Sequence, residues 1–190
     1  MDKIGINVSV SNGPINWDLV KLDPQAIKFA YIKTDANRLW NAYGAAYAGI
    51  QFGYYHATSF NSEALSEAKS FRNAIKEMPP PSLPCVLQIK GDEITLPSDH
   101  VQLWISTFIM DMIQSGYPKM MLSAPAYFLN THLPGTHPFG HLPLLLMHYQ
   151  KGFTAPRGWD KIKIWQFTSK GNVMGISTDV CLSRAEELNF

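Results

Sequence analysis

A buried β-strand is predicted at residues 84–90, which read Pro-Cys-Val-Leu-Gln-Ile-Lys. The stretch follows a proline-rich turn, begins as a short apolar run and ends in polar residues, which is typical of a strand that delivers side chains to one end of a sheet. Because side chains alternate along a strand, Gln88 and Lys90 face one side and Ile89 faces the other. The chemistry at this end of the sheet therefore depends on an amide and an ammonium group.

Strands alternate with helices on both sides of this stretch. The other predicted strands span residues 3–9, 27–33, 51–58, 119–123, 143–149 and 161–168. The predicted helices span residues 16–22, 38–48, 61–78 and 98–115, with a short helical turn at 125–130. Residues 173–180 are expected to add a short strand before a helical tail at 182–188. This alternation predicts a parallel sheet, and seven or eight such strands predict a TIM-like (β/α)-barrel.

The composition fits one globular unit without a strong net charge. The chain has 190 residues, of which 46% are hydrophobic and 12% aromatic, so we expect a single domain over residues 1–190. Sixteen Lys and Arg balance fifteen Asp and Glu, for a formal net charge of +1. No overall field favours nucleic acid or an anionic membrane, and we expect no nucleic-acid partner.

The sequence contains no apolar run of the length that a membrane span needs, and its start lacks the long apolar region of a signal peptide. We therefore expect a chain that is cytoplasmic, or that is released or assembled without a Sec leader. Cys85 and Cys181 lie in apolar sequence surroundings and are expected to be buried thiols rather than a disulfide framework.

An ordered series of short motifs resembles the glycoside hydrolase family 25 lysozymes. The motifs lie at residues 5–9 (Gly-Ile-Asn-Val-Ser), 15–17 (Ile-Asn-Trp), 29–35 (Phe-Ala-Tyr-Ile-Lys-Thr-Asp), 48–50 (Ala-Gly-Ile), 53–56 (Gly-Tyr-Tyr-His), 164–168 (Ile-Trp-Gln-Phe-Thr), 175–176 (Gly-Ile) and 179 (Asp). The series covers nearly the whole chain. The resemblance implies a modified (β/α)-barrel that hydrolyses the bond between N-acetylmuramic acid and N-acetylglucosamine in peptidoglycan, with carboxylates at the C-terminal ends of the strands.

The chain departs from that family's pattern at the acidic positions. The first-strand motif of the family has Asp where this chain has Asn7, and its fourth strand ends in Asp-x-Glu where this chain has Gln88 and Lys90. The Glu that usually follows the second-strand Lys is shortened to Asp35. Only Asp179 matches the family's late Asp.

These replacements bear directly on glycoside hydrolysis. The reaction needs a protonated carboxylic acid beside the leaving oxygen and a second carboxylate, which acts as nucleophile or base or steadies a substrate acetamido group. An amide does not usefully transfer a proton, and a lysine cation disfavours an oxocarbenium-like transition state. We therefore expect that muramidase activity is lost and that the family-equivalent positions hold no catalytic residue.

Other acids remain as alternatives. Asp92 and Glu93 follow the strand by a few residues and are either solvated loop carboxylates or, through a bulge or shifted loop, substitutes in the cleft. Asp35 and Asp179 form the other alternative pair of carboxyl groups.

Aromatic and amide groups near the strand ends are suited to binding sugar. The candidates are Tyr54, Tyr55, His56, Tyr127, Trp165 and Gln166. Tyr54 and Trp165 have a second interpretation as core residues, because strand aromatics are commonly buried. Lys90 also has two interpretations: an ion pair with Asp35 or Asp179, or a contact with an anionic group such as a lactyl carboxylate or a phosphate.

The segment Thr131–His141 is rich in Pro, Gly and His and lacks periodicity, so it is expected to be an ordered surface excursion. His132, His137 and His141 have no accompanying Cys or closely spaced carboxylate, and we expect no metal site and no cofactor. His56 is expected to be a hydrogen-bonded cleft residue rather than a metal ligand or base.

Together these features predict a lysozyme-like barrel without muramidase activity, which binds peptidoglycan or another carbohydrate or serves as a structural module with a protein partner. Two alternatives remain open. One is an active peptidoglycan hydrolase with non-standard carboxylates, and the other is a structural component of a phage or secretion assembly.

Overall fold

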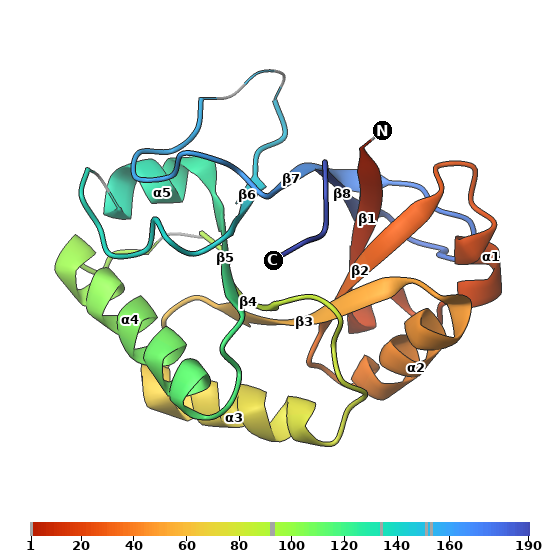
Figure 1. Ribbon diagram of the computed structural model, residues 1–190, viewed down its shortest axis with the longest axis horizontal. Helices are drawn as coiled ribbons and strands as arrows, with labels where there is room; N and C mark the ends of the chain where they lie inside the picture. Colours follow the sequence, from red (N-terminus) through yellow and green to blue (C-terminus); the bar gives the residue numbers. More distant parts are fainter. Residues whose placement is uncertain (1, 92–93, 134, 151, 153) are drawn as a thin grey trace.

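The computed structural model describes residues 2–91, 94–133, 135–150, 152 and 154–190. Eight strands close into a barrel in chain order, with the longer helices packed around its outside (Figure 1). Neighbouring strands from β1 to β7 are parallel, whereas β8 is antiparallel to both β7 and β1. The predicted (β/α)-barrel is confirmed, and the antiparallel eighth strand is its modification, since a regular (β/α)-barrel has eight parallel strands.

Apart from shifted ends, the eight strands lie at the predicted positions, with the exception of the last. They are β1 (Lys3–Val8), β2 (Ile27–Lys33), β3 (Gln51–Thr58), β4 (Cys85–Ile89), β5 (Met120–Pro125), β6 (Leu144–Met147), β7 (Ile164–Gly171) and β8 (Val180–Ala185). The helices are the 3₁₀ helix η1 (Val10–Asn12), α1 (Trp17–Lys21), α2 (Arg38–Ala48), α3 (Ala64–Lys76), α4 (Ser98–Gln114) and α5 (Ala126–His132). The predicted helix at 61–78 is therefore shorter at both ends.

The prediction for the C-terminal segment is wrong. Residues 173–179 form turns and irregular structure rather than a strand, and the expected helical tail at 182–188 is largely the strand β8. The reason is strand pairing in the tertiary structure. β8 hydrogen-bonds to β1 on one side and to β7 on the other, and this pairing outweighs the local helix preference of residues such as Ala185 and Glu186.

Helix α1 begins where the sequence predicts. The Asn16 side-chain oxygen accepts a hydrogen bond from the backbone N–H of Leu19 at 3.2 Å, which satisfies one of the free donors at the helix start. The short helix thus has a defined start directly after the loop that leaves β1.

Apolar side chains fill the barrel interior away from the C-terminal ends of the strands. Phe29 and Tyr31 of β2 are fully buried there and pack edge-to-face, with ring centroids 6.3 Å apart. Gly5 of β1 makes room for the Phe29 ring, because a Cβ at this position would lie 2.3 Å from it. This part of the interior is therefore closed by packed side chains.

The segment Thr131–His141 packs beside another loop. Its first two residues complete α5, and further along the His137 ring lies 4.3 Å from the Trp159 ring between centroids. His137 also shares a 3.0 Å hydrogen bond with the carbonyl oxygen of Arg157. These contacts order the segment at the surface.

Within the described parts of the chain, no helix combines the length and the apolar character that a membrane crossing requires.

Candidate functional site

The C-terminal ends of the barrel strands surround a cavity of about 430 Å³. It is lined by Asn7, Ser9, Ser11, Asn12, Tyr55, Gln88, Lys90, Met147, Tyr149, Gln166, Ser169, Asp179 and Cys181. A neighbouring hollow of about 630 Å³ shares Lys90, Met147 and Tyr149 with it. We call the two together the cleft. This end of a (β/α)-barrel is where such folds place their functional side chains.

The end of β4 contributes Gln88 and Lys90, and both line the cavity as their alternation predicts. Ile89, between them, is buried in the outer layer of the core. Lys90 lies one residue beyond the strand, with an exposed side chain and a backbone N–H that donates to the Thr58 carbonyl oxygen at 3.0 Å. No ion pair joins Lys90 to Asp35 or Asp179, so the first of its two interpretations is not observed.

Neutral polar groups line the barrel interior at this level. Asn7 is 7% exposed, and its Oδ1 is buried without a hydrogen-bond partner among the described residues. Ser123 is the strand neighbour of Gln88, and Ser183 is the strand neighbour of Gln166. The Gln166 Nε2 donates to the Tyr149 hydroxyl at 2.6 Å. The layer thus consists of amides and hydroxyls, none of which is an acid.

Asp179 is the only carboxylate among the described residues that line the cavity. The Asp179 side chain is exposed. The backbone carbonyl oxygen of Asp179 accepts a hydrogen bond from Asn12 Nδ2 at 3.0 Å. Asp35 lies beside the cavity lining and accepts a hydrogen bond from the Val10 N–H at 2.8 Å. The other two candidate acids, Asp92 and Glu93, lie outside the described residues.

Burial affects the remaining ionisable groups of the cavity. Burial is the main cause of the raised pKa of Tyr55. Nearby Cys181 and Asp35 raise this pKa further, whereas a hydrogen bond with Ser9 lowers it. Burial also raises the pKa of Tyr149 and of Cys181. These two phenols and the thiol are therefore neutral at pH 7, and the formal charges of the described lining come from Lys90 and Asp179.

The cleft contains three of the six aromatic and amide residues that the sequence predicts to bind sugar. Tyr55 and Gln166 line the cavity. Tyr127 lines the neighbouring hollow, and its hydroxyl donates to the carbonyl oxygen of Gly91.

The other three, Tyr54, His56 and Trp165, lie away from the cavity. Tyr54 is fully buried in the outer core layer and donates its hydroxyl hydrogen to the Pro79 carbonyl oxygen at 2.6 Å. His56 Nε2 lies 2.7 Å from a Glu67 carboxylate oxygen of α3. The Trp165 Nε1 donates to the His148 carbonyl oxygen at 2.7 Å.

The physical reason is strand alternation, which sends Tyr54 and His56 to the opposite side of β3 from Tyr55. The same rule separates Trp165 from Gln166 on β7. For Tyr54 the structure favours the core interpretation, and the expected cleft position of His56 is not observed.

Sequence reasoning missed Tyr149 and Asn12. Tyr149 was detectable, because it ends the predicted strand at 143–149, and it lines both parts of the cleft with a half-exposed ring. Asn12 carried no such signal, because its place beside the cavity depends on η1 and on its hydrogen bond to the loop before β8.

Two of the three histidines of the segment Thr131–His141, His132 and His137, pack against aromatic rings, and His141 is exposed. His132 stacks on Phe128 at 4.8 Å between centroids, and burial lowers its pKa. In the part of the chain that the structure describes, no group of three or more His, Cys, Asp or Glu residues is placed to hold a metal ion. None of the described residues of this segment lines the cavity.

Comparisons with known proteins agree with this architecture. The model of a family described as Glycosyl hydrolases family 25 matches residues 6–176. The bacterial lysozyme from Streptomyces coelicolor superposes with a TM-score of 0.85 at 25% identity, over 97% of this chain and 92% of that chain. The modular autolysin LytC from Streptococcus pneumoniae, in complex with a synthetic peptidoglycan ligand, gives 0.85 at 22% identity, over 96% of this chain and 46% of that chain.

A family 25 glycosyl hydrolase from Bacillus anthracis has a TM-score of 0.81 at 21% identity, over 97% of this chain and 89% of that chain. No curated protein sequence matches this chain.

Proposed function

The chain belongs to the family 25 glycosyl hydrolases, and we propose that it binds peptidoglycan or a related glycan in its cleft without hydrolysing it. The observation that carries the proposal is the composition of the cavity lining. Asn7, Gln88 and Lys90 occupy the positions at which the family resemblance implies carboxylates, and Asp179 is the one carboxylate of the described lining. Glycoside hydrolysis needs two well-placed carboxyl groups.

The amides and hydroxyls of the cavity lining are suited to binding. Amides and hydroxyls both donate and accept hydrogen bonds, as sugar hydroxyls and acetamido groups do. The buried Asn7 Oδ1 has no partner among the described residues, and an unpaired buried acceptor costs about 1–3 kcal/mol. A ligand N–H or O–H in the cavity would remove this cost. The half-exposed ring of Tyr149 adds an aromatic face beside these groups.

The charge of Lys90 favours a glycan that carries an anionic group. Its side chain is exposed at the cavity and is not paired with Asp35 or Asp179. The lactyl carboxylate of N-acetylmuramic acid is such a group. A solved structure of the same fold, the LytC autolysin, holds a synthetic peptidoglycan ligand, which supports this choice of glycan.

The test is to incubate the purified protein with insoluble peptidoglycan and to analyse both fractions. We expect the protein in the pellet and no muropeptides in the supernatant. The variant Lys90→Ala should leave more protein in solution, whereas Leu103→Ala, an exposed position on α4, should pellet like the wild type.

Release of muropeptides would refute the loss of hydrolysis and would assign the activity to Asp179 and Asp35, or to Asp92 and Glu93. An Asp179→Asn variant would then distinguish these acids. Neither binding nor release would refute glycan recognition and would favour a structural role with a protein partner, such as a phage or secretion assembly.

A further inference from the structure

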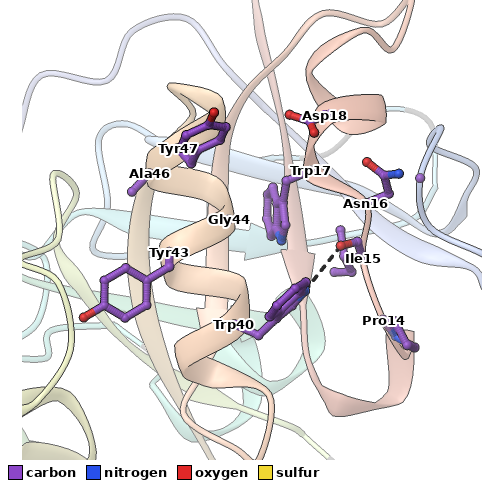
Figure 2. Close-up of a pocket in the computed structure, with 11 residues that line it drawn as sticks. Pro14, Ile15, Asn16, Trp17, Asp18, Trp40, Tyr43, Gly44, Ala46 and Tyr47 are labelled. Carbon is purple, nitrogen blue, oxygen red and sulfur yellow. Dashed lines mark hydrogen bonds between the residues drawn. The ribbon is translucent and has the colours of Figure 1, made fainter.

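Apart from the cleft, a hollow of about 850 Å³ lies on the side of the barrel between α1 and α2 (Figure 2). Its rings come from Trp17 of α1 and from Trp40, Tyr43 and Tyr47 of α2. We call this feature the aromatic groove. None of its lining residues also lines the cleft.

The three aromatic residues of α2 are not needed for the core. Trp40 is 67% exposed, Tyr43 60% and Tyr47 86%. Their spacing of three and four residues brings them to neighbouring positions on the helix surface. In Figure 2 the Trp40 indole points towards Ile15, while the Tyr43 ring projects to the other side of α2. The buried side of α2 is made by Asn41 and small alanine residues instead. Large exposed aromatic side chains that gather in a hollow mark an interaction site.

Close packing sets the shape of the groove before any ligand binds. Gly44 lets α2 approach Trp17, because a Cβ at Gly44 would lie 2.1 Å from the Trp17 ring. The Trp40 Nε1 donates to the Ile15 carbonyl oxygen at 3.4 Å, which orients its indole (Figure 2). Trp17 is 5% exposed, and its Nε1 is a buried donor without a partner among the described residues. In Figure 2 this nitrogen points towards the Trp40 end of the groove.

We propose that the aromatic groove is a second glycan-binding site, which holds the continuation of a glycan strand bound in the cleft. The proposal rests on the proposed function of the cleft. Ser11 and Asn12 of η1 line the cavity, and Pro14 and Ile15, which follow closely, line the groove. One short loop therefore borders both sites.

The direction of α2 completes the path. The helix begins after the C-terminal end of β2, so its first turn, with Trp40, lies at the same end of the barrel as the cleft. Tyr43 and Tyr47 follow along the axis, and a rise of about 1.5 Å per residue places Tyr47 roughly 10 Å beyond Trp40. A glycan strand that leaves the cleft over η1 would therefore contact Trp40 first and Tyr47 last.

The chemistry of the groove favours a glycan over other polymers. Asp18 is the one charged residue of its described lining, and no Lys or Arg lies there to attract nucleic acid or an anionic membrane. Aromatic faces pack against the C–H faces of sugar rings, while the polar edges of Tyr and Trp bond to hydroxyls. A sugar hydroxyl oxygen would also supply the acceptor that the Trp17 indole lacks.

The test compares two probes of one chemistry, glycan strands of alternating N-acetylglucosamine and N-acetylmuramic acid without stem peptides. One is a short fragment that fills the cleft, and the other is a strand long enough to reach Tyr47. Calorimetry should give a Kd for the long strand that is about tenfold lower than for the short fragment. Tyr47→Ala should weaken long-strand binding about threefold to tenfold and leave the short fragment unaffected.

Matched variants control for loss of surface alone. Leu103→Ala, at a residue as exposed as Trp40 (67%), should bind both probes like the wild type. Tyr47→Phe keeps the ring and should retain long-strand affinity. Tyr47 is 86% exposed, so these substitutions leave folding intact.

The outcomes separate the two proposals. Equal binding of long and short probes by the wild type, or long-strand binding unchanged in Tyr47→Ala, would refute the groove site and leave the cleft proposal standing. A dependence on Tyr47 that appears only with strands bearing stem peptides would show a peptide occupant and would likewise refute it. Failure of the wild type to bind either probe would refute both.

Discussion

Asn7, Gln88 and Lys90 show how few atoms separate a glycan-binding cleft from a hydrolytic one. Asn7 keeps the shape of the Asp that the family resemblance implies, and Gln88 is one methylene longer than the corresponding Asp. Neither amide supplies the proton that general acid catalysis needs. At residue 90 the change is larger, because Lys90 places a cation in the cavity lining where the family resemblance implies a carboxylate. The neighbouring phenols and thiol do not restore acidity at neutral pH, because burial raises the pKa of Tyr55, Tyr149 and Cys181.

Restoring the acids is the direct test at this scale. The triple variant Asn7→Asp, Gln88→Asp and Lys90→Glu should release muropeptides above the wild-type background, since a positioned acid or base contributes about 10²–10⁴-fold to such reactions. Chromatography of the soluble fraction measures the release. Adding Asp179→Asn should reduce it, and a folded triple variant without activity would show that the rest of the cleft has diverged as well.

Cys85 makes stability depend on pH. Burial raises the pKa of this thiol from 9.0 to about 12. Above pH 9.0 the unfolded chain releases the proton while the folded chain retains it, so the free energy of unfolding falls as pH rises, by up to about 1.4 kcal/mol per unit. Urea titrations between about pH 8 and pH 10 should show this fall, and Cys85→Ala should reduce its slope. Identical slopes would contradict the assignment.

At the scale of the element, strand alternation decides which of two neighbouring residues reaches the cleft. Tyr54 and Tyr55 are adjacent on β3, yet one packs outside the barrel and the other lines the cavity. Both faces of a barrel strand are buried, so hydrophobicity alone does not distinguish them. The alternation was readable from the sequence, whereas the identity of the inner face was not.

The contact between β1 and β2 depends on a missing side chain. Gly5→Ala would place a Cβ 2.3 Å from the fully buried Phe29 ring, so the ring or the backbone would have to shift. We expect a loss of about 1–3 kcal/mol in the free energy of unfolding, measured by urea titration. Adding Phe29→Leu should cost less in the Gly5→Ala background than in the wild type. Additive costs would show that the two sites do not clash.

At the scale of the whole molecule, β8 closes the barrel. It pairs with both β1 and β7, and the loop before it carries Asp179 into the cavity lining. The sheet edges that β8 covers would otherwise expose unpaired backbone groups. The last strand therefore supports the fold and the cleft together.

Removal of residues 180–190 should abolish cooperative folding, because it opens the barrel along β1 and β7. Circular dichroism and size-exclusion chromatography should show a chain without a sharp thermal transition and with a tendency to aggregate. A control that lacks only residues 189–190, beyond β8, should unfold cooperatively. A cooperative transition in the longer deletion would contradict the closing role of β8.

The sequence by itself determined the alternation of strands and helices, the resemblance to one enzyme family and the replacement of its acids by Asn7, Gln88 and Lys90, because these are local properties of residue type and spacing. Only the tertiary structure decided that residues 180–185 form a strand, that Tyr54, His56 and Trp165 lie away from the cavity, and that Asn12 and Tyr149 border it. These outcomes depend on pairing and packing between segments far apart in the chain, which local pattern does not encode.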